Sequence, residues 1–389
     1  MRVGVREFTK VFETFRVLEE DPLPRFFSKH YPYTRLDVFD RQPSPKEYKV
    51  IELENEYLRL TILPELGARL YSAYDKKRGE QIFHYNNVIR PAMIAHRGAW
   101  IAVGIEFNLC NRPHHTVDNF SPVDYGYRKN EDGSSTVFFG SLNLASGVRY
   151  IVFITLKPGI PRIDVEIRTY NTELIPSRYY FWSNAAIDAS EELRFFYPGT
   201  LSTQGRYPVN EEGVDLSWYK NYVKAADCFI LDSEEDFFAA YDYKSGKGLV
   251  HFADHNLVPG KKIFTWGTSE DGLFWKDILS DKGIPYVELQ SGRFLTQAIV
   301  EFIDPLMLDS WVEYWYPVYD LGGVTYANDK AAMFINQNTG IVNIYSCVTC
   351  KEAKLELWKK NENLFSRKIE LNAGQTVSVQ VDIISCLLY

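Results

Sequence analysis

The sequence has little of what membrane proteins and nucleic-acid-binding proteins need. Its 389 residues contain no run of about 18 consecutive apolar residues, so no membrane-spanning helix is expected. Lys and Arg number 43 against 51 Asp and Glu, which makes the net charge −8. Because phosphate backbones are bound by basic surfaces, this balance argues against a nucleic-acid partner. The N-terminal residues also lack the continuous apolar stretch of a signal peptide, which favours a cytoplasmic protein.

Cysteine is scarce as well, and the motifs of several enzyme classes are missing. The five cysteines are scattered and odd in number, which argues against a secreted disulfide framework. Cys347 and Cys350 have C-x-x-C spacing, but without a second pair we interpret them as two small strand residues. No dinucleotide-binding, P-loop, zinc-protease or serine-hydrolase motif occurs. Adjacent His114 and His115 usually point apart and would need further ligands, so neither a metal nor another cofactor is expected.

Long stretches of helical periodicity are rare, whereas short alternating segments are common. The segments VRYIVFITL and RIDVEIRTYN alternate as half-buried strands do, and GLFWKDILSDKG is the one clear candidate for a short helix. We therefore predict a mainly β fold, a large sandwich of antiparallel strands. Residues 1–47 are expected to form an N-terminal arm packed on the main body, and 48–324 the main domain. Residues 325–389 should form a small C-terminal β segment, either separate from the main domain or continuous with it.

A carboxylate stands in the middle of the strand-like segment PYVELQSGRF. Tyr286, Glu288 and Gln290 share one face of this strand, while Val287 and Leu289 share the other. An acid among apolar residues is costly unless it is paired or used. Glu288 is therefore a candidate functional residue.

The densest polar segment lies at residues 95–126 and holds three of the seven histidines. It supplies donors for hydroxyl groups and groups for proton transfer, which favours a polar pocket over a solvated loop. Its candidate site residues are His96, Arg97, Glu106, Asn108, His114, His115 and Asp124. Elsewhere, Trp182 and Trp266 are equally compatible with stacking on a sugar ring and with burial in the core.

Seven segments carry a family resemblance. They are, in order, LGARLYSAYDKKRGEQIFH, RGAWIAVGIEFN, FWSNAA, GVDLSWYKN, PGKKIFTWG, VELQSG and EYWYP. Over roughly residues 48–320 the chain resembles the family known as domain of unknown function 5107, which is often attached to tetratricopeptide repeats. No such repeats occur here, so a stand-alone version is expected. The family is similar to the galactose mutarotase superfamily, which implies a β-supersandwich with a sugar on the concave face of a sheet.

The resemblance to the aldose 1-epimerases of that superfamily implies roles for individual residues. Glu288 in VELQ matches their catalytic base and is followed by Gln290. Arg97 matches their sugar-binding arginine. Their first histidine corresponds to His114 or His115 in NRPHH.

The second histidine of those epimerases, which acts as the acid, has no counterpart. The segment FWSNAA offers Trp182 or Asn184 in its place. Glu106 is the candidate replacement, with Asp124 in reserve. Because glycosidic bonds are usually broken by two carboxyl groups, Glu106 as acid and Glu288 as base or nucleophile would suit a glycoside hydrolase.

Three functions follow as hypotheses. The leading one is a glycoside hydrolase acting on oligosaccharides or glycosides; the others are an aldose 1-epimerase and a non-catalytic sugar-binding module. In each case the partner is a sugar, and the expected binding residues are His96, Arg97, Asn108, His114, His115, Trp182, Asn184, Trp266 and Gln290. The sequence leaves the sugar, its linkage and the oligomeric state open, a homodimer included.

Overall fold

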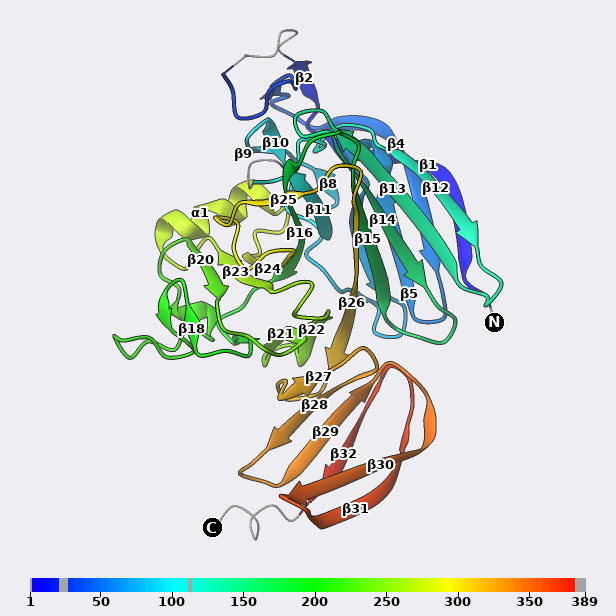
Figure 1. Cartoon of the computed structure of the whole chain (residues 1–389), viewed down its shortest axis with the longest axis vertical. Coiled ribbons are helices and arrows are strands. Elements are labelled where there is room, and N and C mark those ends of the chain that lie inside the picture. Colours follow the sequence, from blue (N-terminus) through cyan, green and yellow to red (C-terminus); the bar gives the residue numbers. More distant parts are fainter. Residues whose placement is uncertain (1, 21–26, 111–113, 382–389) are drawn as a thin grey trace.

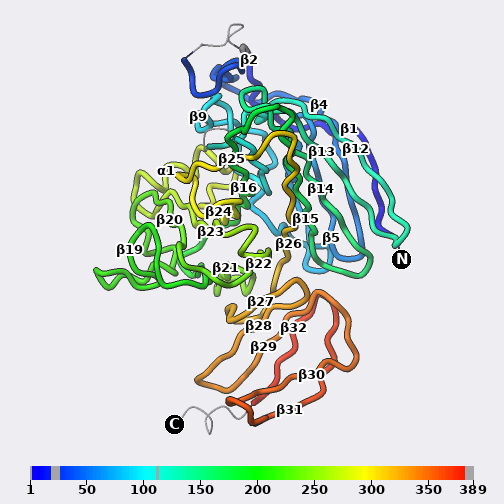
Figure 2. The backbone as a smooth tube through the Cα atoms, in the orientation of Figure 1, coloured from blue at the N-terminus to red at the C-terminus, as the bar shows by residue number. Residues whose placement is uncertain are grey.

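The computed structural model describes residues 2–20, 27–110 and 114–381 (Figure 1). Within these ranges the regular structure is mostly β, and the single α-helix is α1 (Glu270–Leu279). Figure 2 traces the backbone from a body of two large sheets into a smaller unit that holds the C-terminal strands. No helix in the described ranges is long and apolar enough to span a bilayer.

The first large sheet carries the features that matter for function. Its fourteen strands are largely antiparallel, in the order β19-β18-β20-β23-β24-β16-β11-β6-β5-β4-β1-β8, with β25 paired to β16 and β7 to β6. Their bounds are β1 Gly4–Thr14, β4 Ser44–Glu54, β5 Leu58–Leu63, β6 Arg69–Asp75, β7 Glu80–Gln81, β8 Val88–Ile89, β11 Ile105–Cys110, β16 Ser177–Asp188, β18 Leu201–Ser202, β19 Gly205–Arg206, β20 Ala226–Ile230, β23 Gly260–Thr265, β24 Tyr286–Gly292 and β25 Glu301–Ile303.

The second large sheet has eight antiparallel strands in the order β12-β13-β14-β15-β26-β22-β21-β17. Their bounds are β12 Asp124–Lys129, β13 Ser135–Asn143, β14 Val148–Leu156, β15 Ile163–Asn171, β17 Leu193–Phe196, β21 Phe237–Asp242, β22 Lys247–Phe252 and β26 Leu308–Tyr319. Two short 3-10 helices, Pro64–Leu66 and Tyr219–Asn221, lie in the connections.

The main core lies between the two large sheets. In β14, Val148, Val152 and Leu156 point inward, because alternate residues of a strand face the same side. They belong to one buried cluster with Leu60 and Ile62 of β5 in the other sheet. Two sheets that bury one face each against the other form a sandwich, so the predicted mainly β, antiparallel fold is confirmed.

The N-terminal segment contributes a full strand to the first sheet. Strand β1 pairs with β4 over its whole length, from Gly4 opposite Glu54 to Thr14 opposite Ser44. The rest of residues 1–47, which were expected to form an arm, includes part of a separate four-stranded sheet. That sheet has the order β2-β3-β10-β9 and consists of β2 Val17–Glu20, β3 Leu36–Phe39, β9 Ala92–Ala95 and β10 Gly98–Trp100.

The C-terminal strands form a small β unit below the two large sheets (Figure 1). It combines a four-stranded sheet with a hairpin: β27 Tyr326–Ala327, β28 Ala331–Asn336, β29 Ile341–Ser346 and β32 Gln375–Gln380 in the sheet, β30 Cys350–Lys359 and β31 Glu362–Leu371 in the hairpin. A second buried cluster joins Tyr345 of this unit to Val318 and Val250 of the eight-stranded sheet. Cys347 and Cys350 are free thiols here.

Helix α1 lies next to the first sheet, close to β23 and β24 (Figure 1). Its start is fixed by Ser269, whose hydroxyl accepts a hydrogen bond from the amide of Gly272. Leu279 at its last turn packs with Trp100 and Tyr286 in a small buried cluster. The helix that the sequence predicts in GLFWKDILSDKG is therefore present, shifted a few residues toward the N-terminus.

The register of the first sheet lines up polar residues on one of its faces. Glu106 of β11 pairs with Asn184 of β16, Asn184 with Gln290 of β24, and Gln290 with Lys262 of β23. Because directly paired residues on antiparallel strands point to the same side, these side chains form a row. Arg69 of β6 extends the row, with its Nη2 atom 3.1 Å from Oε1 of Glu106. This row positions the candidate site.

Gly104, directly before β11, has a structural role that a substitution can test. Its φ is +58°, and a Cβ atom would lie 1.8 Å from the carbonyl oxygen of Leu70. Gly104→Ala is expected to lower the free energy of unfolding by about 3 kcal/mol or more, from left-handed strain and the backbone clash together. Urea denaturation measures this loss.

Gly159→Ala is the matched control, because φ is +71° there and no atom lies within 4 Å of the added Cβ. It should cost only the conformational strain, about 1 kcal/mol. Equal losses in the two variants would contradict the role of close packing at Gly104.

Candidate active site

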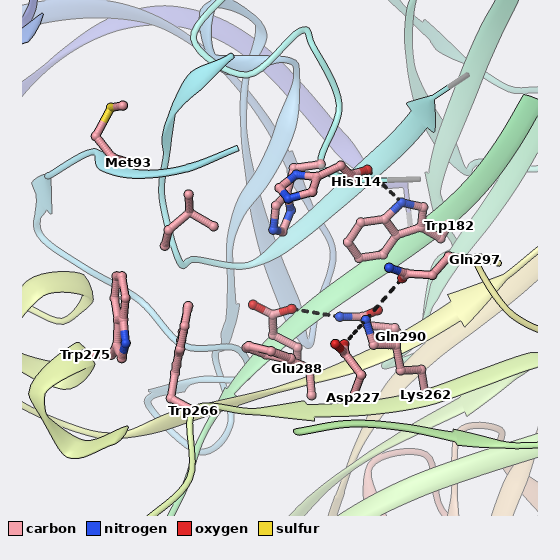
Figure 3. A pocket seen from close by; sticks show the side chains of 13 residues that line it. Met93, His114, Trp182, Asp227, Lys262, Trp266, Trp275, Glu288, Gln290 and Gln297 are labelled. Atoms are coloured by element: carbon pink, nitrogen blue, oxygen red, sulfur yellow. Dashed lines mark hydrogen bonds and ion pairs between the residues drawn. The ribbon is translucent and has the colours of Figure 1, made fainter. Parts of the chain in front are cut away.

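A cavity of about 400 Å³ opens on the face of the first sheet that carries the polar row (Figure 3). This face is turned away from the main core, since Val287 and Leu289 of β24 point into that core. The volume falls within the usual range for small-molecule sites. The lining residues are Met93, Ile94, His114, His115, Trp182, Asp227, Lys262, Phe264, Trp266, Trp275, Glu288, Gln290 and Gln297.

Glu288 lies in the middle of the cavity. Its side chain has little solvent contact, although it faces the opening, and Nε2 of Gln290 donates to Oε2 at 2.8 Å. Burial raises the pKa of the Glu288 carboxyl, and the negative charge of Glu106 acts in the same direction, whereas His115 and Lys262 oppose the rise. A carboxylate with a raised pKa in a cavity is suited to accept and return a proton.

Glu288 is held by a chain of hydrogen bonds that runs through Tyr286 to Trp266. Tyr286 donates its hydroxyl to Oε1 of Glu288 at 3.4 Å, and Nε1 of Trp266 donates to the same hydroxyl at 2.9 Å. The ring of His84 stacks on Tyr286 with a centroid distance of 5.2 Å, and its Nδ1 lies 2.6 Å from Asp188. These contacts restrict the rotamer of Tyr286 and therefore the direction in which it donates.

Glu106 lies behind the cavity wall and does not line the cavity. Four side chains surround its carboxylate: Arg69 (3.1 Å), Trp100 (Nε1 at 3.1 and 3.2 Å), Asn119 (3.0 Å) and His115 (2.9 Å). Burial alone would raise the pKa of Glu106, but the positive charges of His115 and Arg69 outweigh it and hold the pKa well below its usual value. The surroundings therefore favour an ionised carboxylate, not the protonated leaving-group acid expected from the sequence.

His115 connects Glu106 to the cavity. Its Nδ1 lies 2.9 Å from Oε2 of Glu106, and its ring is held between Trp100 and Trp182, at centroid distances of 4.7 and 5.4 Å. With Nδ1 occupied, Nε2 is the ring nitrogen left for a ligand. A carboxylate behind an imidazole fixes the orientation of the ring.

His114 has a different environment from its neighbour. Its ring stacks on His96 with a centroid distance of 3.8 Å, and its carbonyl accepts a hydrogen bond from Nε1 of Trp182 at 3.1 Å. Burial, with the positive charges of His115 and His96, lowers the pKa of His114 to about 3, so this imidazole is neutral. The rings of the two neighbours lie at 79° to one another, with their centroids 5.2 Å apart.

The two ends of the cavity differ in chemistry, and Figure 3 shows them on either side of Glu288. We call one the polar end: Trp182, Asp227, Lys262, Gln290 and Gln297. Lys262 forms a close ion pair with Asp227, and its Nζ donates to Oε1 of Gln297 at 3.2 Å. We call the other the aromatic end: Met93, Ile94, Phe264, Trp266 and Trp275.

Six predicted site residues line the cavity: Glu288, Gln290, His114, His115, Trp182 and Trp266. His96, Arg97, Glu106, Asn108, Asn184 and Asp124 are not among the lining residues. His96 stacks on His114 and Asn184 belongs to the polar row, so both lie next to the cavity. Asp124 is exposed at the start of β12, in the other sheet.

Arg97 lies outside the lining of the cavity, within hydrogen bonds to the surrounding loops. Its guanidinium donates to the carbonyl of Thr34 at 2.6 Å, to the carbonyl of Val117 at 3.0 Å and to the hydroxyl of Ser121 at 2.5 Å. These bonds tie together the loops around residues 34 and 117–121. Asn108 is similarly used, since its Oδ1 accepts the amide of Thr116 at 2.6 Å and so holds the segment that follows His115.

Lys262 and Asp227 were missed because their segments look like ordinary turns and surface strands. Alternation would have found Lys262, since Lys262, Phe264 and Trp266 are spaced by two residues and Trp266 was already a candidate. Asp227 lies opposite Phe264 on the neighbouring strand β20, a pairing that no local pattern reveals.

A surface group of possible metal ligands lies apart from these residues. Asp236, Asp254 and His255 have ligand atoms within 4.8 Å of one another, and Nδ1 of His255 is 2.7 Å from Asp236. None of the three lines the cavity.

The cluster around Glu106 predicts a pH-dependent contribution to stability. Glu106→Gln leaves the guanidinium of Arg69 buried without its anion, which should lower the free energy of unfolding by about 3–5 kcal/mol at neutral pH. The folded pKa of Glu106 lies below the ordinary 4.5, so its contribution is present above that pH and is lost as pH falls through the folded pKa. The difference between wild type and variant should therefore narrow below pH 4.5 in urea denaturation series.

Glu362→Gln serves as the control, because Glu362 is exposed at the start of β31. This substitution should change the free energy of unfolding by no more than about 0.5 kcal/mol at every pH. A wild-type advantage over Glu106→Gln that does not change on acidification would contradict the ionised state of Glu106.

Comparisons with known proteins agree with this architecture. A crystal structure of a TPR-domain containing protein from Parabacteroides distasonis has a TM-score of 0.74 and 26% identity; the match covers 82% of this chain and 55% of that one. A putative aldose 1-epimerase from Klebsiella pneumoniae has a TM-score of 0.54 at 12% identity, over 70% and 80% of the two chains. A galactose mutarotase-like protein from Lactobacillus casei has a TM-score of 0.49 at 11% identity, over 69% and 100%.

The likeness to the putative epimerase shows a shared fold, and the antiparallel β-sandwich expected from the sequence is confirmed. The present chain spans about half the length of the Parabacteroides protein. A family model described as a domain of unknown function matches residues 27–318, most of the chain. By this match the chain belongs to that family, the domain of unknown function DUF5107.

Proposed function

We propose that the cavity binds a sugar ring and that Glu288 and His115 transfer protons at its anomeric centre, as in an aldose 1-epimerase. The observation that carries this proposal is that both groups line one cavity in different electrostatic settings. Glu288 has a raised pKa, whereas His115 is backed by the ionised carboxylate of Glu106. A carboxyl and an imidazole that line the same cavity can act as an acid–base pair.

The reaction follows from these two groups. Glu288 accepts the proton of the anomeric hydroxyl while the His115 imidazolium protonates the ring oxygen. The bond between the anomeric carbon and the ring oxygen then breaks, and an open-chain aldehyde forms. Rotation about the adjacent carbon–carbon bond presents the other face of the carbonyl to the hydroxyl. On ring closure Glu288 gives its proton to the new anomeric hydroxyl, and the former ring oxygen returns its proton to His115. This yields the other anomer with protons and electrons balanced.

The environment of Glu106 favours this reaction over hydrolysis by a pair of glutamates. A hydrolase acid must be protonated before it donates to the leaving oxygen. Glu106 has a lowered pKa, four polar partners and no place in the cavity wall. We therefore assign it a positioning role, in which its carboxylate holds Nδ1 of His115 and fixes the orientation of the ring.

The polar end of the cavity supplies contacts for the sugar hydroxyls. Lys262 offers a donor, Asp227 an acceptor, and Gln290 and Gln297 offer both. The opposite charges of Lys262 and Asp227 neutralise one another, which suits an uncharged hydroxyl-rich ligand. Trp182 adds an indole beside these groups.

Glu288→Gln should reduce anomer interconversion by about 10²–10⁴-fold, because the amide keeps the shape of the side chain but cannot accept the proton. Polarimetry or exchange NMR with freshly dissolved α and β anomers of common aldoses measures the rate. Glu301→Gln, at an exposed position of β25, is the control and should keep the wild-type rate. Wild-type rates in Glu288→Gln would remove the proposal; release of a new reducing sugar from glycosides would favour hydrolysis, and binding without turnover a binding module.

The pH profile gives a second check on Glu288. Because its pKa is raised and the base must be ionised, kcat/KM should fall on acidification with a midpoint above 4.5, the ordinary value for glutamate. Lys262→Met removes a positive charge that lowers the pKa of Glu288, so the midpoint should move to higher pH. A midpoint at or below 4.5, or one that Lys262→Met leaves in place, would rule out Glu288 as the base.

A further inference from the structure

We infer that the cavity is built for two linked sugar residues, one at the polar end and one at the aromatic end. The inference rests on the proposed function in one respect, namely that the reacting ring lies against Glu288. Figure 3 shows Trp266 and Trp275 on one side of Glu288, with Lys262 and Asp227 on the other. The ligand class is therefore a disaccharide or a longer oligosaccharide.

The aromatic end has few groups that could bind hydroxyls. Met93, Ile94 and Phe264 carry no conventional donor, and Nε1 of Trp266 is already engaged by the hydroxyl of Tyr286 at 2.9 Å. The indoles of Trp266 and Trp275 lie parallel, with a centroid distance of 4.1 Å and an interplanar angle of 17°. Each indole therefore covers one face of the other, and only an outer face remains for the apolar C–H face of a sugar ring.

This surface also stays partly uncovered. Met93 is 49% exposed on β9, and Trp266 and Trp275 are half-buried. Large apolar side chains left open beside a polar cavity are typical of ligand contacts. Their position within the wall of the same cavity makes a further part of the ligand the occupant.

A single sugar ring cannot contact the polar end and the aromatic end of the cavity at the same time. The ends lie on opposite sides of Glu288, and they offer hydrogen bonds on one side and flat apolar surface on the other. A ring that places its hydroxyls against Lys262 and Asp227 leaves the indoles uncovered. A second residue linked to that ring through a hydroxyl other than the anomeric one covers them.

The test is a chain-length series on the full chain. Calorimetry or ligand-observed NMR compares glucose with cellobiose, maltose and their trisaccharides, and galactose with lactose and β-1,4-galactobiose. At least one disaccharide should bind about tenfold more tightly than its monosaccharide, the gain expected from one aromatic contact. Methyl glycosides of the same disaccharides have no free anomeric hydroxyl, so they should show no anomer interconversion.

Two variants test which residues are responsible for the tighter binding of the disaccharide. Trp275→Ala and Met93→Ser should each remove most of the disaccharide advantage and leave monosaccharide affinity within about twofold, since neither residue belongs to the polar end. Met93 is half-exposed, so its substitution keeps the test valid if Trp275→Ala fails to fold. Trp358→Ala, at an exposed indole on β30 of the C-terminal unit, is the control and should retain the full advantage.

The outcomes separate this inference from the proposed function. No disaccharide advantage in any series, or an equal loss for mono- and disaccharides in Met93→Ser, would overturn the two-residue cavity. A disaccharide advantage that Met93→Ser removes supports it, even if Glu288→Gln shows no catalytic defect. An unchanged rate in Glu288→Gln would refute only the assignment of Glu288 as the catalytic base.

Discussion

The register of four neighbouring strands is the constraint on which the site depends. Pairing of β11 with β16, β16 with β24 and β24 with β23 brings Glu106, Asn184, Gln290 and Lys262 to one face of the sheet. A shift of one residue in any strand would turn its polar side chains into the core. The apolar residues between them, such as Leu289, therefore select the register that also assembles the cavity.

A compact set of charges follows from that register. Glu106 meets Arg69 on one side and His115 on the other, at 3.1 and 2.9 Å, within a region that excludes water. Buried charges of this kind are tolerated only where each has a partner and its hydrogen bonds are satisfied. Trp100 and Asn119 complete the set by donating to the same carboxylate. The cluster holds one imidazole in a fixed orientation at the cavity wall.

Local patterns in the sequence were sufficient for the fold class and for the central carboxylate. The alternation around Glu288 placed it opposite the core-facing residues of its strand, which the structure bears out. The observed hydrogen bonds of Arg97 go instead to Thr34 and Ser121. Because these residues are distant from it in sequence, a local pattern could not predict the contacts. No local rule could separate Arg97 from Arg69, because both are buried and only the pairing of β6 with β11 places Arg69 beside Glu106.

The buried cluster shared by the eight-stranded sheet and the C-terminal unit limits where the chain can be truncated. The family model ends at residue 318, inside β26, yet Val318 and Tyr319 pack in one cluster with Tyr345 and Cys347 of the C-terminal unit. Cutting the chain at the end of the matched region would expose this apolar surface on β21, β22 and β26 of the eight-stranded sheet. Such a fragment would be less stable and would expose an apolar patch that favours aggregation. The C-terminal unit therefore completes the apolar packing at this side of the eight-stranded sheet.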